Sequence, residues 1–306
     1  MNKKIAFYIQ AMRLRTLPLS LAGVCLGLML AAADYNINPL VIVFTILTTL
    51  SLQILSNVSN ELGDFLSGTD VDTRQGPKGA LSLGALTEGE YKKMIKIYVG
   101  LCLVFGGLLI YYSFGTLLCL ESLMFMILGV AAIRAAISYT LGKSPYGYRG
   151  WGDLYVFIFF GIVSVLGSYF IAAHTIKNWY LLFPAASIGL FSVGVLNTNN
   201  IRDMKTDMST RTTIPLLLGE KRAKIYQWVL IILGWISMIV YSRLRMYDIF
   251  HYLFILSLPL FIIHLVIINN NSGKAMDKAL PLLSFATLLF SLLSGLGYLL
   301  YLLGDF

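Results

Sequence analysis

The chain has 306 residues, of which 58% are apolar and only 12% are charged, and its mean hydropathy is +0.77. Soluble domains carry charge on about a quarter of their residues, so this composition excludes an ordinary soluble domain. The net charge of +8 at pH 7 follows the pattern of membrane orientation rather than that of nucleic-acid binding. We therefore expect an all-α polytopic membrane protein that lies in a lipid bilayer and has no nucleic-acid partner.

Apolar runs near the ~20 residues needed to cross a bilayer recur along the whole chain. They predict nine transmembrane helices in one bundle, which we treat as a single domain, 1–306. The connections 61–91 and 201–221 carry most of the polar residues and are the longest. The predicted spans are 14–33, 39–60, 93–113, 116–138, 153–173, 180–201, 222–242, 247–269 and 279–303.

The basic residues predict the orientation of these spans. With the N-terminus in the cytoplasm, only Lys177, Arg243 and Arg245 lie outside, and the other 20 of the 23 Lys and Arg residues lie inside. Cytoplasmic loops are the ones enriched in Lys and Arg. The sequence therefore predicts a protein of the bacterial cytoplasmic membrane, with its N-terminus and both long polar connections on the cytoplasmic side.

Two arginines, Arg13 and Arg15, precede the first apolar run. Long basic side chains at a helix start commonly reach to the lipid headgroups and anchor the helix. The alternative is that one of them, Arg13, contacts a phosphate at the cytoplasmic mouth of the bundle. Spacing alone favours the anchoring role.

A first polar cluster ends the second span. Asn57, Asn60 and Asp64 stand at i, i+3 and i+7 and so share one helix face, and Glu61 lies beside them. An ordinary acidic loop does not explain them, because polar groups near membrane depth are costly and usually functional. Carboxylate and amide oxygens suit Mg²⁺, whose shell is completed by water and phosphate oxygens. The cluster is therefore a candidate metal–diphosphate site.

The loop after this cluster adds two cations, Arg74 and Lys78, among glycines. Such a loop suits a diphosphate, to which Arg offers bidentate contacts and Lys a point charge. Further along, an aromatic connector rich in Gly and Pro follows Tyr139 and leads to Asp153. Asp153 fits two roles equally well, an acid at a helix N-terminus and a carboxylate that orients a substrate.

A second polar cluster repeats the first. Asn200, Asp203 and Asp207 again stand at i, i+3 and i+7, with Arg202 between them. Both clusters follow even-numbered spans, four helices apart, which suggests two pseudo-repeated four-helix halves and a ninth span. Two facing acidic helix faces predict a site for a metal-chelated polyanion. A transporter is the alternative class, but carriers place their substrate sites near the midplane.

These strings resemble the two aspartate-rich motifs of the UbiA superfamily of intramembrane aromatic prenyltransferases, over nearly the whole chain. The motifs in this sequence are Asn60-Glu61-x-x-Asp64 and Asn200-x-x-Asp203-x-x-x-Asp207. Within the family, the full strings look most similar to those of the 1,4-dihydroxy-2-naphthoate polyprenyltransferases of menaquinone synthesis. One departure is Glu61, where the family usually has Asp. Another is Lys78, where relatives tend to have Leu-Arg.

The resemblance implies a Mg²⁺-dependent enzyme. It would transfer a polyprenyl group from polyprenyl diphosphate to a small aromatic acid, 1,4-dihydroxy-2-naphthoate, with loss of diphosphate and CO₂, giving demethylmenaquinone. A relative that uses another acceptor, such as 4-hydroxybenzoate, is the alternative within the same fold. The implied metal ligands are Asn60, Glu61, Asp64, Asp203 and Asp207. The implied diphosphate-binding residues are Arg13, Asn57, Asn60, Arg74, Lys78, Asn200 and Arg202. The implied catalytic residues are Asp64, Asp203, Asp207, Tyr139 and Asp153, with the Tyr139 ring able to stabilise an allylic cation.

Overall fold

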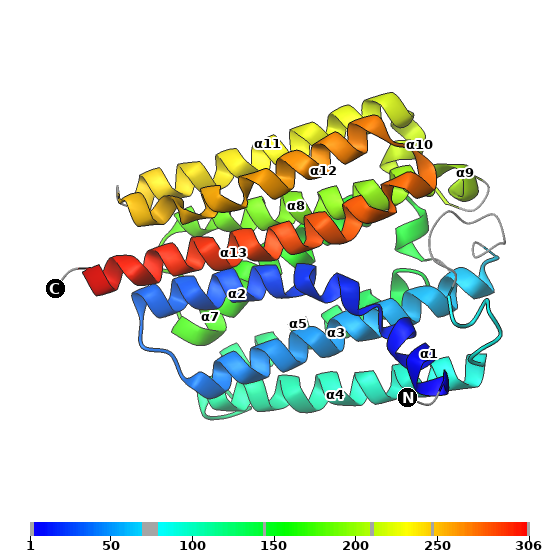
Figure 1. Ribbon diagram of the computed structural model, residues 1–306. Coiled ribbons are helices and arrows are strands. Elements are labelled where there is room, and N and C mark those ends of the chain that lie inside the picture. Colours follow the sequence, from blue (N-terminus) through cyan, green and yellow to red (C-terminus); the bar gives the residue numbers. More distant parts are fainter. Residues whose placement is uncertain (1–2, 69–78, 143–144, 209–210, 246–247, 305–306) are drawn as a thin grey trace.

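The computed structural model describes residues 3–68, 79–142, 145–208, 211–245 and 248–304, and in these ranges the chain is a bundle of long helices (Figure 1). Its described part holds nine helices that are long and apolar enough to span a membrane. The predicted all-α polytopic fold is confirmed. The spans are built from α1 (Lys3–Met12), η1 (Leu14–Thr16) and α2 (Leu17–Asp34); α3 (Pro39–Leu66); α4 (Glu88–Phe114); α5 (Leu120–Ser138); α6 (Gly152–Val156), η3 (Phe157–Gly167) and α7 (Ser168–Ala173); η4 (Trp179–Leu181) and α8 (Leu182–Arg202); α11 (Glu220–Arg245); η5 (Ile249–Ser257) and α12 (Leu258–Asn270); and η6 (Gly273–Lys278) and α13 (Ala279–Gly304).

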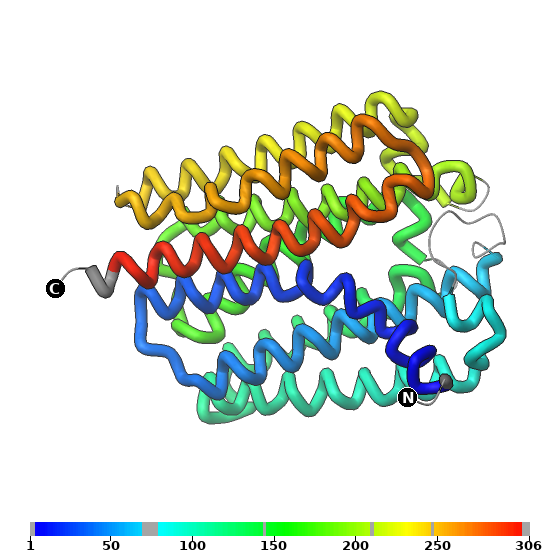
Figure 2. Tube along the Cα trace, viewed as in Figure 1, coloured from blue at the N-terminus to red at the C-terminus, as the bar shows by residue number. Residues whose placement is uncertain are grey.

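The described residues of both polar motifs lie at one end of the bundle. This motif end, at the right of Figure 1, is where α3 and α8 finish and where the short helices η2 (Tyr146–Tyr148), α9 (Met204–Asp207) and α10 (Ile214–Leu218) lie. The chain passes back and forth between the two ends, so the N-terminus lies at the motif end and the C-terminus at the opposite one (Figure 2). The expectation that both clusters lie on one side is therefore confirmed.

Local signals place the helix boundaries around the first cluster. Thr87 and Glu90 form a capping box at the start of α4, so this helix begins at Glu88 rather than at the predicted residue 93. The preceding helix α3 continues to Leu66, beyond the predicted residue 60. Asn60 and Asp64 therefore both lie on a rigid helix and not at the edge of a loop.

The first span is longer than the predicted 14–33, because α1 precedes η1 and α2. Its chain breaks at Arg13, which adopts a left-handed backbone conformation with φ 49°, between α1 and η1. That conformation is uncommon for any residue other than glycine, so the surroundings must hold it. Helix α2 then starts at Leu17 with Pro18 in its first turn, a position where proline's missing N–H costs nothing.

Buried aromatic side chains gather in the half of the bundle formed by α8, α11, η5, α12 and α13. Five buried aromatic rings meet there, with centroids 4.7 to 6.1 Å apart. They are Phe191, Trp235, Phe254, Phe261 and Phe290. Helix α8 also approaches η3 closely at Gly161, where an added Cβ would lie 2.6 Å from the carbonyl oxygen of Ala185. Small residues allow such close helix contacts within a membrane.

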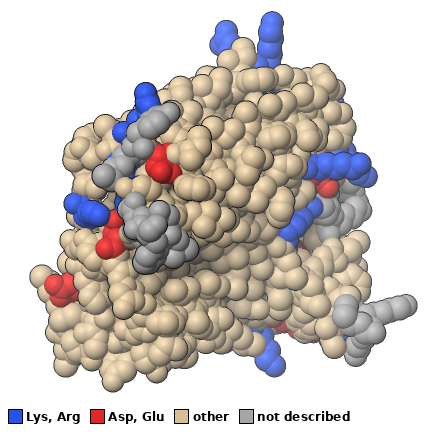
Figure 3. Space-filling model, turned by 60° about the vertical axis from the view of Figure 1, so that its left-hand side comes forward, with Lys and Arg blue, Asp and Glu red and all other residues tan. Residues whose placement is uncertain are grey.

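The outer surface of the bundle is apolar. Leu118, Ile127 and Ile249 are 85%, 71% and 75% exposed, which suits contact with lipid chains and not with water. In the space-filling view an uncharged band separates the Lys, Arg, Asp and Glu side chains of one end from those of the other (Figure 3). The molecule is therefore an integral membrane protein.

Candidate active site

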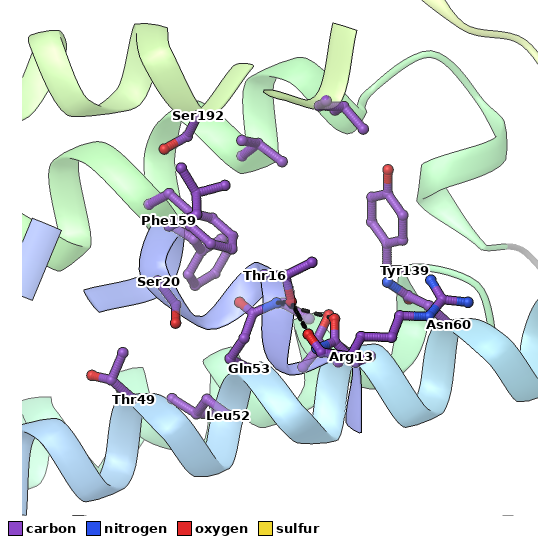
Figure 4. A pocket seen from close by; sticks show the side chains of 18 of the residues that line it. Arg13, Thr16, Ser20, Thr49, Leu52, Gln53, Asn60, Tyr139, Phe159 and Ser192 are labelled. Atoms are coloured by element: carbon purple, nitrogen blue, oxygen red, sulfur yellow. Dashed lines mark hydrogen bonds between the residues drawn. The ribbon is translucent and has the colours of Figure 1, made fainter. Parts of the chain in front are cut away.

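A cavity of about 710 Å³ runs into the bundle from the motif end and is lined by α2, α3, α5, η3 and α8. Figure 4 shows Arg13, Asn60 and Tyr139 together at one end of this cavity and Ser20, Thr49 and Leu52 at the other. The polar end coincides with both sequence clusters. The remainder is mostly apolar and lies at membrane depth, which suits a hydrophobic chain attached to a polar head.

Side chains of α3 hold the break in the first span. The Asn57 amide donates to the carbonyl oxygen of Met12 at 2.8 Å and to the hydroxyl oxygen of Thr16 at 2.9 Å. Gln53 donates to the same hydroxyl and to the Asn57 amide oxygen. These bonds give partners to polar groups of Met12 and Thr16 on either side of the break. They thereby hold Arg13 at the cavity mouth (Figure 4). The structure therefore shows Asn57, which we expected to bind diphosphate, in contact with the backbone beside Arg13.

Glu61 is almost fully buried, with 1% of its surface exposed. One carboxylate oxygen accepts hydrogen bonds from the Tyr91 hydroxyl and the Leu81 amide, and the other lies 3.6 Å from a terminal nitrogen of Arg13. A direct metal contact by Glu61 would require these partners to yield. In this arrangement Glu61 fixes the direction of the Arg13 side chain.

Asp64 lies one turn beyond Asn60 on α3 and faces the second cluster. Its Oδ1 accepts a hydrogen bond from the Tyr148 hydroxyl at 2.9 Å and lies 3.3 Å from Nη2 of Arg211. The Asn60 amide oxygen accepts from the hydroxyl of Thr140 at 3.2 Å. Burial and the nearby Asp64 carboxylate raise the pKa of Tyr148 to about 12, so this hydroxyl keeps its proton and remains a donor at neutral pH.

The second cluster is divided between two environments. Asp207 faces the first cluster, and its Oδ1 lies 3.2 Å from Nε of Arg211. Asp203 instead pairs with both Nε and Nη2 of Arg202, at 2.9 and 2.7 Å. Arg202 also donates to Asp277 at 2.8 Å. The single face expected for this cluster is interrupted, because α8 ends at Arg202 and the short α9 begins after Asp203.

The other predicted residue of this cluster, Asn200, lines the cavity from α8. It lies on the opposite wall of the cavity from Asn60, which projects from α3. The structure thus brings the two predicted amides to one cavity. Arg74 and Lys78 lie outside the described residues.

A row of aromatic side chains lines the cavity wall next to the polar end. Tyr139 packs edge-on against Tyr146, with centroids 5.3 Å apart, and Tyr146 stacks on Tyr155 at 4.0 Å. Phe159 continues the row. Burial raises the pKa of Tyr139, so its hydroxyl stays protonated at neutral pH and does not act as a base there.

Asp153 lies close to this row but has its own partner. Its Oδ2 accepts a hydrogen bond from the Tyr226 hydroxyl at 3.0 Å, which ties the start of α6 to α11. Of the two roles left open for Asp153, this contact supports an anchor for the aromatic connector. The role of a carboxylate that orients the substrate stays a prediction.

The donor set at the polar end fits a hard divalent cation. Among the described residues no three His, Cys, Asp or Glu side chains lie close enough to hold a metal by themselves. Asp64 and Asp207 nevertheless converge on one guanidinium. Asn60 lies one turn before Asp64 on α3, and Asn200 lies near the end of α8, shortly before α9 and Asp207. Two carboxylates with amide oxygens leave places for water and phosphate oxygens, as Mg²⁺ prefers.

Sequence reasoning missed three residues of this site, Arg211, Tyr148 and Asp277. Arg211 stands four residues after Asp207, a spacing that signals an ion pair on one helical turn. Tyr148 lies in the aromatic connector and Asp277 in η6, and neither position carries a sequence signal that links it to the clusters. Only the packing of distant segments brings them together.

The sequence matches the model of the UbiA prenyltransferase family over residues 20–290. It is 33% identical over 302 residues to a 1,4-dihydroxy-2-naphthoate octaprenyltransferase of Haemophilus influenzae, covering 97% of both chains. It is 36% identical over 256 residues to an Escherichia coli protein of the same name, covering 83% of this chain and 82% of that one.

Solved structures share the fold. A UbiA homologue from Aeropyrum pernix matches with a TM-score of 0.67 at 16% identity, over 94% of this chain and 97% of that one. A UbiA homologue from Archaeoglobus fulgidus, solved bound to DMAPP and Mg²⁺, matches with a TM-score of 0.62 at 13% identity, over 93% and 97%. Fold and sequence comparisons agree, and the resemblance inferred from the motifs is confirmed.

Proposed function

The chain belongs to the UbiA prenyltransferase family, and from this premise we propose that it transfers a polyprenyl group from polyprenyl diphosphate to 1,4-dihydroxy-2-naphthoate. The observation that carries the proposal is the cavity, whose polar end is lined by Asp64, Arg202 and Arg211 and whose remainder is mostly apolar. Asp207 of the second motif adjoins this end through Arg211. A diphosphate with a long isoprenoid chain has this same division into a polyanionic head and an apolar tail. The naphthoate acceptor is the one named for the relatives above.

In the proposed reaction the allylic C–O bond of the donor breaks and diphosphate leaves with the electron pair. A new C–C bond forms at the ring carbon that bears the carboxylate. Loss of CO₂ from that carbon restores the aromatic ring. Both hydroxyls are retained, so the immediate product is the quinol form of demethylmenaquinone.

Asp64 and Asp207, with the amides of Asn60 and Asn200, would hold Mg²⁺ at the polar end. When bound, the metal neutralises charge on the diphosphate and so lowers the barrier to C–O cleavage. Arg13 at the cavity mouth is placed to bind the same leaving group, and its charge-assisted hydrogen bonds strengthen as negative charge develops. Arg74 and Lys78 stay predicted partners of the diphosphate.

The predicted roles of Asp203 and Arg202 require both residues to give up the ion pair that they form with each other. Asp203 can bind the metal, and Arg202 the diphosphate, only when the ion pair between them opens. Arg202 would then also have to yield its contact with Asp277. We therefore assign the direct metal contact of this motif first to Asp207, which already faces Asp64 through Arg211.

The aromatic row gives the acceptor and the allylic cation a common wall. The faces of Tyr139 and Tyr155 carry the negative side of the ring quadrupole, which attracts a cation and stacks with a flat aromatic acid. Apolar walls around the row exclude water, which would otherwise capture the cation. The row lies between the polar end and the apolar remainder, where the reacting carbon of a seated donor would be.

The orientation of the protein is part of the proposal. The N-terminus and both motifs lie at the same end of the bundle (Figure 1), and the sequence places 20 of 23 basic residues on that side. By the positive-inside rule this end is cytoplasmic, so we place the site at the cytoplasmic face of a bacterial membrane. Soluble diphosphate would then leave directly into the cytoplasm.

Release of diphosphate tests the proposed chemistry. Purified protein in detergent, given polyprenyl diphosphate and the naphthoate, is expected to release diphosphate only when Mg²⁺ is present. Asp64→Ala and Asp207→Ala are expected to abolish this release, because these two carboxylates are the assigned metal ligands. A transporter would show no release at all, and wild-type rates in both variants would refute the assigned site.

A further inference from the structure

Among the described residues, Arg211 contacts a carboxylate of each motif. Its Nη2 lies 3.3 Å from Oδ1 of Asp64, and its Nε lies 3.2 Å from Oδ1 of Asp207. The side chain is 11% exposed, so the bridge is shielded from bulk water. Guanidinium is thus the cation that joins the two motifs across the cavity.

The bridge is built into the local backbone and is not a chance surface contact. The amide of Arg211 donates to the carbonyl oxygen of Asp207 at 3.1 Å, and the amide of Thr212 donates to the carbonyl oxygen of Tyr148 at 2.9 Å. The guanidinium lies 4.9 Å from the centre of the Tyr148 ring, in a cation–π contact. The Tyr148 hydroxyl in turn bonds Asp64, so Arg211, Tyr148 and Asp64 form a closed ring, and Asp207 joins it through Arg211.

The charges of Arg211, Asp64 and Asp207 determine which ion can take the place of the guanidinium between the two carboxylates. Burial lowers the pKa of Arg211, but Asp64 and Asp207 outweigh that effect and leave its pKa raised, so it is charged at any working pH. Two carboxylates and one guanidinium leave a net charge of −1. Oδ1 of Asp64 already accepts from both Tyr148 and Arg211, so a divalent cation that takes the Oδ1 atoms of Asp64 and Asp207 competes with Arg211 for them.

We propose that Arg211 holds the two motif carboxylates together and exchanges with the incoming metal–diphosphate, becoming a ligand of the diphosphate. The proposal rests on the proposed function, since it takes a diphosphate as the group that Arg211 moves to. A guanidinium released from two carboxylates keeps its planar set of five N–H donors, which matches phosphate oxygens. The same side chain therefore positions the metal ligands before binding and neutralises the leaving group afterwards.

The exchange differs in its consequences from a fixed structural brace. A brace would hold Asp64 and Asp207 in place, so its removal would weaken metal binding and diphosphate binding alike. In the exchange, Arg211 competes with the metal for the carboxylates and assists the diphosphate. Removal of Arg211 then changes the two affinities in opposite directions.

The first arm of the test measures binding of Mn²⁺ alone, from the electron paramagnetic resonance signal of the free ion, to the full chain in detergent. Arg211→Gln is expected to bind Mn²⁺ about tenfold more tightly than wild type, because it removes one positive charge roughly 5 Å from the metal position. Lys205→Gln is the matched control, since Lys205 lies in the same region and is exposed, where solvent screens its charge. Equal or weaker binding by Arg211→Gln, or an equal gain in Lys205→Gln, would overturn the proposal.

The second arm measures binding of inorganic diphosphate in the presence of Mg²⁺ by calorimetry. Arg211→Gln is expected to bind it about tenfold more weakly, the loss typical of a hydrogen bond between charged groups. Unchanged or tighter binding would overturn the proposal. If Arg211→Gln does not fold, Arg211→Met, which keeps most of the side-chain volume over Tyr148, carries the same expectations. Neither arm uses prenyl transfer, so failure of the proposed reaction in wild type would be seen separately.

Discussion

Asn57 offers a sharp test of how the fold positions the active site, because its amide donates hydrogen bonds to the broken first span beside Arg13. The substitution Asn57→Ala removes two donated hydrogen bonds, at 2.8 Å to Met12 and at 2.9 Å to Thr16. It also leaves the Met12 carbonyl at the break without that donor. At about 1 kcal/mol for each bond plus the cost of an unpaired polar group, the loss is about 2 to 3 kcal/mol.

That loss falls on the conformation of Arg13, whose left-handed backbone depends on these contacts. If Asn57 acts by positioning Arg13, then Asn57→Ala raises the KM for polyprenyl diphosphate about tenfold, the value of one charged hydrogen bond, and leaves the acceptor KM unchanged. Arg13→Gln should produce the same change. The double variant should be no worse than either single one, because side chains that act as a unit are not additive.

The assay is prenyl transfer with each substrate varied in turn, together with the midpoint of thermal unfolding in detergent. The midpoint of Asn57→Ala is expected to fall by roughly 5 °C. Gln53→Ala is the matched control, since Gln53 contacts Thr16 and Asn57 but not the Met12 carbonyl, and a smaller effect is expected. An unchanged donor KM in Asn57→Ala, or fully additive losses in the double variant, would refute the positioning role.

Three further predictions follow from other contacts. At the end opposite the motifs, Asp34 is buried and paired with Lys177, Arg245 and the Tyr169 hydroxyl, so Asp34→Asn should lower stability by about 2 kcal/mol through the buried arginine it leaves unpaired. Neither KM should change, and an unchanged thermal midpoint would contradict this. Tyr155→Leu should raise the KM for the aromatic acceptor several-fold but not that for the donor, because it removes a stacking face worth about 1 kcal/mol; a selective rise in the donor KM would contradict the acceptor wall. Tyr148→Phe removes the bond to Asp64 and should reduce kcat/KM for the donor about fivefold, whereas a wild-type value would show that this bond does not hold the metal ligand.

The sequence predicted the architecture well because membrane insertion leaves a strong linear signal. Apolar runs of spanning length and the one-sided distribution of Lys and Arg do not depend on which helices touch. What the pattern could not show is the local irregularity. The break at Arg13 depends on Asn57 and Gln53, which lie more than one span away along the chain. The early start of α4 is instead signalled locally by the capping box Thr87-x-x-Glu90, which hydropathy alone does not detect.

The sequence predicted many of the residues that form the candidate site, but not which side chains contact one another there. Spacing along one helix indicated which residues share a face, and it brought Asn60, Asp64, Asn200 and Asp207 to the same end. It gave no information about partners from other segments. For that reason Arg211 could be recognised only as the neighbour of Asp207, and its contact with Asp64 appears only once α3 and α8 lie opposite each other.

The most direct test of the account is transfer of a radiolabelled polyprenyl group by the purified protein. It would be offered 1,4-dihydroxy-2-naphthoate and 4-hydroxybenzoate in parallel, each with Mg²⁺ and with a chelator. We expect a prenylated product from the naphthoate alone, formed only with Mg²⁺. Product from the benzoate alone would contradict the assigned acceptor, and absence of product from both would contradict the proposed transfer itself.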